Sequence, residues 1–215
     1  MRVYSIPLRV RFRGVLQREG VLLQGPAGWG EFSPFPAYGP RQCARWLAAA
    51  LEAAHQGWPS ARRKRIPVNA IIPAVSPNRA HAMTRASGCR TAKVKVAEPG
   101  QCDADDIARV EAVRAALGPA GRVRIDANGA WDVDHAIRMI KKLNRFDLEY
   151  AEQPCRSMDD LAQVRRRVDV PLAADESIRH AEDPVHARVA QAADIAVLKV
   201  QPMGGVRASL RFAEQ

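Results

Sequence analysis

Long apolar runs are missing from this sequence of 215 residues. No stretch approaches the roughly 18 apolar residues that a membrane-spanning helix requires. The first residues, 1–13, alternate apolar and basic side chains and contain no apolar segment of the signal-peptide kind. We therefore expect a protein without a membrane segment, located in the cytoplasm.

Cysteine and histidine spacings that are typical of metal sites are also missing. The five histidines form no HExxH pattern, and there is no CxxC pair among the four cysteines, which are Cys43, Cys89, Cys102 and Cys155. In a chain of this length without a signal peptide, free thiols are expected rather than disulfides or a zinc site. The histidines are interpreted as ordinary surface or core residues.

Aromatic residues are scarce, at 6%, and none of them interleaves with the basic runs of this chain. The net charge of +10 leaves three kinds of anionic partner open: nucleic acid, a membrane surface or a small molecule. The basic runs at 141–142 and 165–167 fall on polar faces of expected helices, and the run at 62–65 falls in an expected linker. Solvated charge is the favoured interpretation, so we expect neither nucleic acid nor a membrane as partner.

Residues 1–65 have the pattern of a small α+β domain. Alternation of apolar and polar residues over 2–12, 21–24 and 29–32 predicts two or three antiparallel strands. A helix is expected over 41–55. Between them, the Pro-rich aromatic stretch 32–40 is either a structured turn or a lid over a pocket, and the sequence leaves both open.

Residues 66–215 have a different, repeating pattern. Apolar strands are expected at 66–72, 91–96, 122–127, 148–152, 171–175 and 194–200, with a helix after each, including 77–88 and 186–192. This order is typical of a parallel α/β sheet, and no GxGxxG follows the first strand, which argues against a dinucleotide-binding fold. The fold class is therefore a (β/α) barrel, but six strands fall short of the eight that closure requires. Either the chain is cut off or the barrel is completed from elsewhere.

Three acidic residues stand where expected strands end: Asp126, Glu152 and Asp175. The carboxyl ends of barrel strands build the active site in this architecture. A single acid in such a place is ordinarily a helix cap or a surface residue. Three at equivalent positions predict a divalent metal site, and an all-oxygen ligand set suits Mg²⁺.

Lysines flank these acids on both sides: Lys93 and Lys95 before them and Lys199 after them. Lys93 and Lys95 lie two residues apart and therefore on one face of a strand. Partial burial and neighbouring cations are expected to lower a lysine pKa from about 10.4 towards neutrality, where the amine can act as a base. The expected partner is a small-molecule carboxylate whose α-proton a lysine removes.

The motifs that contain these residues resemble the enolase superfamily, muconate-lactonizing-enzyme subgroup. They are Lys93-Val94-Lys95, Asp126-Ala127-Asn128, Glu152-Gln153-Pro154, Asp175-Glu176-Ser177 and Leu198-Lys199-Val200-Gln201. Within the subgroup, Ile125 to Trp131, Ala151 to Cys155 and Lys199 to Gly205 are similar to o-succinylbenzoate synthases of the actinobacterial type. The resemblance covers essentially the whole chain and implies a barrel of the enolase type, 66–215, behind an N-terminal capping domain, 1–65.

The resemblance also implies a role for each residue. Asp126, Glu152 and Asp175 would bind Mg²⁺, with Asn128 and Glu176 supporting them. Lys95 would be the base and Lys199 the cation on the opposite face of the substrate, while Lys93 would tune Lys95. The implied reaction is that of a hydro-lyase of menaquinone synthesis, which dehydrates 2-succinyl-6-hydroxy-2,4-cyclohexadiene-1-carboxylate through an enediolate. Loops around 12–20 and 32–40 would close on the succinyl group.

Two other functions stay open. An N-acylamino-acid racemase or dipeptide epimerase of the same superfamily would use the same pair of lysines. From another class, a basic protein that binds anions or nucleic acid without catalysis is the alternative, against which the complete set of site residues argues. The last barrel strands of the family have no counterpart before Gln215, and the oligomeric state is left open, a monomer being compatible with the sequence.

Overall fold

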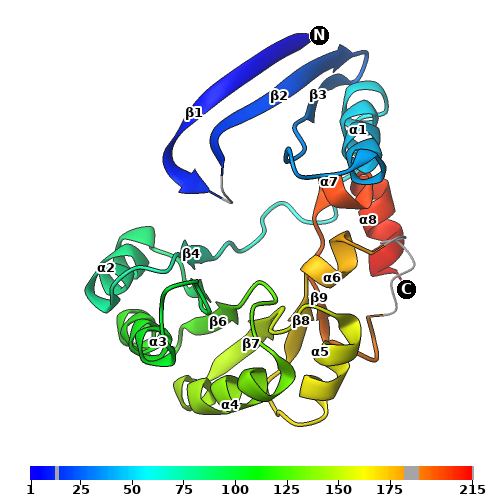
Figure 1. Cartoon of the computed structure of the whole chain (residues 1–215). Helices are drawn as coiled ribbons and strands as arrows, with labels where there is room; N and C mark the ends of the chain where they lie inside the picture. Colours follow the sequence, from blue (N-terminus) through cyan, green and yellow to red (C-terminus); the bar gives the residue numbers. More distant parts are fainter. Residues whose placement is uncertain (13–14, 182–188, 215) are drawn as a thin grey trace. The chain divides into compact units, whose positions relative to one another are not determined.

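The structure of the chain is a computed structural model that describes residues 1–12, 15–181 and 189–214 (Figure 1). The chain forms two compact units. The first contains 1–64 together with segments from 179–187 and 198–215, and the second contains 65–178 and 188–197.

An antiparallel sheet forms the first part of the first unit. Its strands are β1 (Arg2–Phe12), β2 (Val15–Gly25) and β3 (Gly28–Phe32), in the order β1-β2-β3. Residues 15–20, expected to belong to a closing loop, lie in β2 instead, and residues 13–14 lie outside the described residues. Backbone pairing such as Ser5 with Glu19 and Ile6 with Arg18 extends the hairpin and explains the difference.

Helix α1 (Pro40–His55) packs against β2 and β3 of this sheet. The contact is close because a Cβ atom at Gly30 would overlap the carbonyl oxygen of Ala50, and one at Gly25 would overlap that of Ala54. Glycine at these two positions therefore lets the helix backbone lie directly on the strands. Ala49, Ala50 and Ala54 are buried in this layer.

The stretch 32–40 is a structured turn. The backbone nitrogen of Tyr38 donates to the carbonyl of Phe35 at 2.9 Å, and the two rings meet edge to face with centroids 5.6 Å apart. Phe35 also contacts the ring of Trp46 on α1, and the guanidinium of Arg18 lies 4.4 Å from the centre of the Phe35 ring. Of the two interpretations of this stretch, the structure supports the turn.

The last helices of the chain also belong to the first unit. They are α7 (Val200–Met203) and α8 (Val206–Ala213). The buried carboxylate of Glu52 on α1 accepts hydrogen bonds from the backbone nitrogens of Val206, at 2.6 Å, and Arg207, at 3.1 Å. Because these nitrogens have no partner within their own helix, the acid caps the start of α8.

The second unit is built on a parallel sheet of six strands that follow one another in sequence order. They are β4 (Ala70–Ile72), β5 (Thr91–Lys95), β6 (Arg122–Asp126), β7 (Leu148–Glu152), β8 (Leu172–Ala174) and β9 (Ile195–Ala196). The connecting helices are α2 (Pro77–Ser87), α3 (Asp103–Leu117), α4 (Val133–Leu143), η1 (Asn144–Phe146), α5 (Met158–Arg165) and α6 (Glu176–Arg179), whose last residue belongs to the first unit. Neighbouring strands joined by helices make an arc of a barrel (Figure 1), which confirms the predicted fold class.

The two outer strands of the arc are shorter than predicted. Instead of 66–72, only Ala70–Ile72 forms β4, and Ile66, Val68 and Ile71 are 73%, 74% and 60% exposed. The prediction that this strand is buried on both faces was therefore wrong. In the described sheet β4 has β5 as its one neighbour, so Ile72 is buried but the alternate residue Ile71 is not.

At the other edge, β9 contains Ile195 and Ala196 rather than 194–200, and Val200 begins α7. For the helix expected at 186–192, residues 186–188 lie outside the described residues. Residues 189–192 form a turn, in which the nitrogen of Ala192 donates to the carbonyl of Val189 at 2.8 Å. The helix prediction for this part was wrong.

The structure bears on the cysteines and on the apolar segments of the chain. All four cysteines are free thiols, as predicted. Within the described parts of the chain, no helix has both the length and the apolar character that crossing a membrane demands.

Candidate active site

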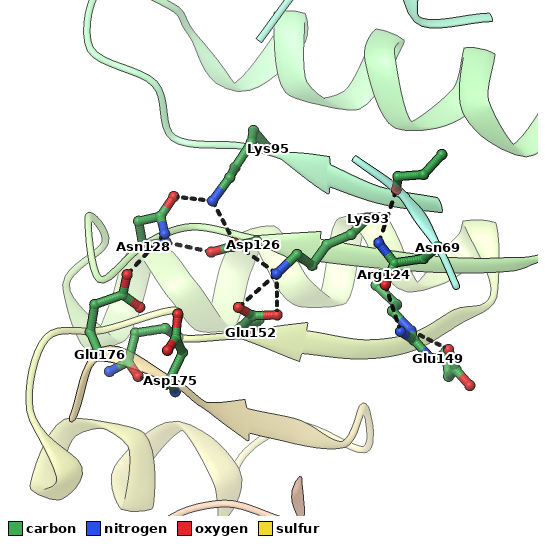
Figure 2. A network of polar contacts seen from close by, with 12 residues as sticks. Asn69, Lys93, Lys95, Arg124, Asp126, Asn128, Glu149, Glu152, Asp175 and Glu176 are labelled. Carbon is green, nitrogen blue, oxygen red and sulfur yellow. Dashed lines mark hydrogen bonds and ion pairs between the residues drawn. The ribbon is translucent and has the colours of Figure 1, made fainter. Parts of the chain in front are cut away.

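Two lysines on β5 define one side of the candidate site. Ala92 and Val94 point into the core and are buried, so the alternate residues Lys93 and Lys95 share the other face of the strand. The Lys93 ammonium lies 2.8 Å from both carboxylate oxygens of Glu152 and 3.3 Å from Oδ2 of Asp126. Lys95 Nζ lies 2.5 Å from Oδ2 of the same Asp126 (Figure 2).

Three carboxylates stand at the carboxyl ends of the next three strands. Asp126 is the last residue of β6, Glu152 is the last residue of β7, and Asp175 directly follows β8. The parallel register sets Lys95 beside Asp126, and Asp126 beside Glu152. Each of the three acids is only 1% exposed. The sheet therefore gathers the predicted acids and two of the three predicted lysines at one edge, as Figure 2 shows.

The charges in this cluster oppose one another. Burial raises the pKa of Glu152, and the negative charges of Asp126 and Asp175 raise it further, although Lys93 acts in the other direction. Burial also acts to raise the pKa of Asp126, but Lys95 and Lys93 outweigh it, so the pKa of this carboxyl is lowered. The pKa values of these two neighbouring acids thus shift in opposite directions, because Lys95 contacts Asp126 and not Glu152.

The pKa of Lys93 departs from the expectation of a lowered value. Burial alone would lower it, but the carboxylates of Glu152 and Asp126 raise it above its ordinary value. The sequence showed the two lysines as neighbours that repel each other. It did not show that both oxygens of Glu152 accept from Lys93.

The chemistry of these donors fits a divalent metal ion. They are hard oxygen ligands at the ends of three different strands. Burial and the charges of Asp126 and Asp175 raise the pKa of Glu152, and a bound cation would favour its ionised form. As the side chains stand, no group of three His, Cys, Asp or Glu residues in the described chain is arranged to hold an ion. The Lys93 ammonium bridges Glu152 and Asp126 instead.

Asn128 joins the lysine to a further acid. Its backbone is left-handed, with φ of 50°, and its nitrogen donates to Oδ1 of Asp126 at 3.0 Å. Its side-chain oxygen accepts from Lys95 at 2.6 Å, while its side-chain nitrogen donates to Oε1 of Glu176 at 3.1 Å. Asn128 and Glu176, the two predicted supporting residues, thus lie in one hydrogen-bonded chain with Lys95 and Asp126.

Two family models match the chain. The family model "Enolase C-terminal domain-like" matches residues 77–215, and "Enolase N-terminal domain-like" matches residues 3–54. The chain belongs to the enolase superfamily.

Curated members of the superfamily are similar over the whole chain. An o-succinylbenzoate synthase of Thermobifida fusca is 67% identical over 214 residues, which cover 100% of this chain and 68% of that protein. The o-succinylbenzoate synthase of Mycolicibacterium smegmatis is 55% identical over 217 residues, covering 100% of this chain and 67% of that protein. The chain thus spans about two thirds of the length of these relatives.

Solved structures of the superfamily share the fold. An L-Ala-D/L-Glu epimerase from Bacillus subtilis aligns with a TM-score of 0.80 at 23% identity, over 99% of this chain and 77% of that one. A dipeptide epimerase from Enterococcus faecalis, complexed with Mg and a dipeptide, gives 0.81 at 21% identity, over 99% of this chain and 77% of that one. At these identities the likeness concerns the enolase-type fold alone.

Lys199, the third predicted lysine, belongs to the first compact unit of this enolase-superfamily chain. Its backbone is extended, with φ of −126° and ψ of 118°, directly before α7. Its carbonyl oxygen accepts from the nitrogen of Met203 at 3.1 Å. Its place opposite Lys95 stays a prediction.

Gln153 is a residue of the site whose role was not predicted from the sequence. It is fully buried and left-handed, with φ of 41°. Its side-chain oxygen accepts from the nitrogen of Asp175 at 2.8 Å, and from the nitrogen and hydroxyl of Ser177 at 3.2 and 2.9 Å. Gln153 therefore holds the backbone of a predicted metal ligand. The sequence signal that could have indicated this role is the position of Gln153, an amide directly after the acid that ends β7.

A second polar group occupies the same sheet nearer the beginning of the strands. Arg124 lies 2.5 Å from Glu149 and donates to Oδ1 of Asn69 at 3.0 Å (Figure 2). Its guanidinium also lies 4.8 Å from the centre of the Tyr150 ring. In this group Arg124 is paired with the carboxylate of Glu149 and with the amide of Asn69. These charges are paired with one another, and the side chains of Arg124 and Glu149 stay about a quarter exposed, at 23% and 25%.

Proposed function

We propose that this chain carries the active site of an o-succinylbenzoate synthase, a hydro-lyase that converts 2-succinyl-6-hydroxy-2,4-cyclohexadiene-1-carboxylate to o-succinylbenzoate. The observation that carries the proposal is the 67% identity to the Thermobifida fusca enzyme over the whole chain. The lysine and carboxylate cluster at the ends of β5 to β8 supports it, because it contains the groups that removal of an α-proton requires.

Asp126, Glu152 and Asp175 would hold Mg²⁺ in this enzyme. A bound Mg²⁺ supplies positive charge that attracts the substrate carboxylate and acidifies its α-proton. Both oxygens of Glu152 now accept from the Lys93 ammonium at 2.8 Å, so a metal ion would share this carboxylate with Lys93 or displace the ammonium. The E. faecalis structure with Mg supports the choice of a divalent cation at this fold.

Lys95 would remove the α-proton of the substrate. The proton then leaves with the hydroxyl group as water, so the same amine acts as base and as acid. Lys199 would stabilise, as a cation, the negative charge that develops on the substrate. Lys93 would keep its charge near Lys95 and so disfavour a second charge there.

Turnover by lysine variants of the intact protein tests these roles. We expect Lys95→Ala and Lys199→Ala each to lower kcat by roughly a thousandfold or more, since each removes a group that acts in the reaction. The matched control is Lys142→Ala, an exposed lysine of α4, which should leave kcat unchanged. Near-normal turnover by either site variant would show the assignment to be wrong.

The racemase or epimerase alternative is distinguished by a second substrate. An N-acylamino-acid racemase would exchange the α-proton of N-acylamino acids for deuterium in D₂O and would leave the cyclohexadiene substrate unchanged. The fold likeness to dipeptide epimerases, at 21–23% identity, does not favour that activity. The curated relatives favour the dehydration.

We further propose a capping domain, 1–65, and a barrel domain, 66–215. The family matches at 3–54 and 77–215 support this division. By contacts, however, 198–215 groups with 1–64. A cytoplasmic location and the absence of nucleic-acid and membrane partners stay predictions. The oligomeric state stays open, a monomer being compatible with the sequence; cell fractionation tests the location and light scattering the oligomeric state.

A further inference from the structure

Helix α3 buries an arginine directly behind the site. Arg109 is 1% exposed, although guanidinium groups are buried only when they are paired and hydrogen-bonded. Its Nη1 donates to the carbonyl oxygen of Lys95 and to Oδ1 of Asp106, both at 2.8 Å. The backbone of the proposed base is thus bonded to a charged side chain of another element.

The same arginine reaches the loop after the preceding strand. Its Nε donates to the carbonyl of Val75, which follows β4, at 2.9 Å, and its Nη2 donates to the side-chain oxygen of Gln101. Gln101 in turn donates to the carbonyl of Ala74 at 3.2 Å. One guanidinium therefore ties together the loops that follow β4 and β5.

Asp106 contacts the backbone just after Lys95. Its Oδ2 accepts from the nitrogen of Ala97 at 2.8 Å. Ala97 has φ of 59°, in the left-handed region that a residue with a Cβ rarely adopts without support. The carboxylate thereby fixes a turn that begins two residues after Lys95.

We infer that Arg109 and Asp106 are positioning residues that hold the strand end carrying Lys95 in its reactive place. The inference rests on the proposed function, in which Lys95 is the base. The Lys95 amine must meet the α-carbon closely, and a displacement of about 1 Å of a reacting group can reduce a rate by about a hundredfold. Neither residue touches the lysine amine, so their effect passes through the backbone of residues 95–97.

Arg114 provides a matched control on the same helix. It also binds several backbone carbonyls, namely those of Phe146, Gly118, Gly121 and Asp147, at 2.7 to 3.0 Å. These carbonyls precede β6 and β7, at the opposite end of the strands from Lys95. Replacing Arg114 therefore removes a comparable set of bonds without loosening the end that carries the base.

The test compares Arg109→Met with Arg114→Met in the intact protein. We expect Arg109→Met to lower kcat by about tenfold to a hundredfold with KM changed less than about threefold. The amide hydrogen of Ala97 should exchange faster in this variant. Arg114→Met should keep kcat within about twofold and the exchange at Ala97 unchanged, even where its melting temperature falls as much.

If Arg109→Met does not fold, the double variant Asp106→Asn with Arg109→Met takes its place, because it leaves no unpaired charge buried. Unchanged kcat in the Arg109 variant, or an equal loss in the Arg114 variant, would overturn the inference. Should the unmodified protein make no o-succinylbenzoate, the proposed function fails. The exchange at Ala97 then decides the inference alone, and equal exchange in both variants refutes it.

Discussion

At the scale of single residues, the site depends on side chains that hold other side chains. The acceptor oxygen of Gln153 takes three hydrogen bonds from the segment Asp175–Ser177. None of them involves the carboxylate that would bind the metal. Such supporting bonds commonly change metal affinity by about 10- to 100-fold when removed.

We therefore predict that Gln153→Leu weakens Mg²⁺ binding by about tenfold or more, because the backbone of Asp175 loses its acceptor. Calorimetric titration of the variant with MgCl₂ measures this. Gln191→Leu, at an exposed glutamine of the same unit, should bind Mg²⁺ like the unmodified protein. Equal affinity in the Gln153 and Gln191 variants would contradict the role assigned to Gln153.

Cys155 should be the least reactive thiol of the chain. It is buried, and this burial, with the charges of Asp160 and Asp132, raises the pKa of Cys155 to about 12. At pH 8 about one thiol in ten thousand would be ionised, whereas the other three cysteines are exposed or half-buried. Iodoacetamide labelling with peptide mapping should modify Cys155 only after unfolding, and rapid native labelling there would contradict its burial.

Asp194 should make the fold sensitive to acid. Its pKa is lowered: burial opposes the shift, but hydrogen bonds from Arg165 and from the nitrogen of Leu172 outweigh it. A lowered folded-state pKa means that the stabilisation is present above the ordinary value of 3.8 and is lost as the pH falls below it. Asp194→Asn should therefore flatten the loss of unfolding free energy as the pH falls below about 4 in urea titrations. If the variant loses as much unfolding free energy at low pH as the unmodified protein, Asp194 is not a source of the acid sensitivity.

Much of the site could be predicted because side chains alternate along a strand and because the apolar runs mark where the strands end. Lys93 and Lys95 share a face by alternation, and Asp126 and Glu152 end their strands as the apolar runs indicated. The pairing of Lys93 with Glu152 and the role of Gln153 depend on which strands become neighbours. The sequence pattern of one strand contains no such information.

At the scale of elements, the close packing of α1 on the sheet gives a direct stability prediction. A Cβ at Gly30 would overlap the backbone oxygen of Ala50, which cannot move without displacing the helix. Gly30→Ala should lower the unfolding free energy by about 1–3 kcal/mol, the usual range for overpacking. Gly39→Ala is the control, because that site is exposed, meets nothing within 4 Å and has φ of −74°. Similar melting temperatures for both variants would show that the packing is not tight.

Helices and strands were predicted well where a clear repeat of apolar residues ended at a capping or turn residue. Helix α2 ends at Ser87 before Gly88, whose φ of 66° lies in the left-handed region that favours glycine at the end of a helix. The apolar stretch at 66–69 was predicted as a strand because its composition is that of one. Its backbone does not join the described sheet, and strand pairing is a property of neighbours rather than of composition.

At the scale of the whole molecule, the lysines and acids predicted from the sequence divide between the two compact units. Lys95 and the three acids belong to the second unit, and Lys199 belongs to the first. The curated relatives are longer than the chain, which covers 68% of the Thermobifida fusca protein. Activity is therefore measured on the intact protein.

In the proposed reaction, a metal ion held by three strand-end acids enables a lysine to dehydrate the substrate. The most direct measurement is the initial rate of o-succinylbenzoate formation from the cyclohexadiene substrate, with MgCl₂ and after treatment with EDTA. We predict a rate that falls by roughly a thousandfold or more without metal, that returns when Mg²⁺ is added back, and that stays low in Asp126→Asn at any Mg²⁺ concentration. Product formation that is equally fast with EDTA, or in the Asp126 variant, would contradict the account.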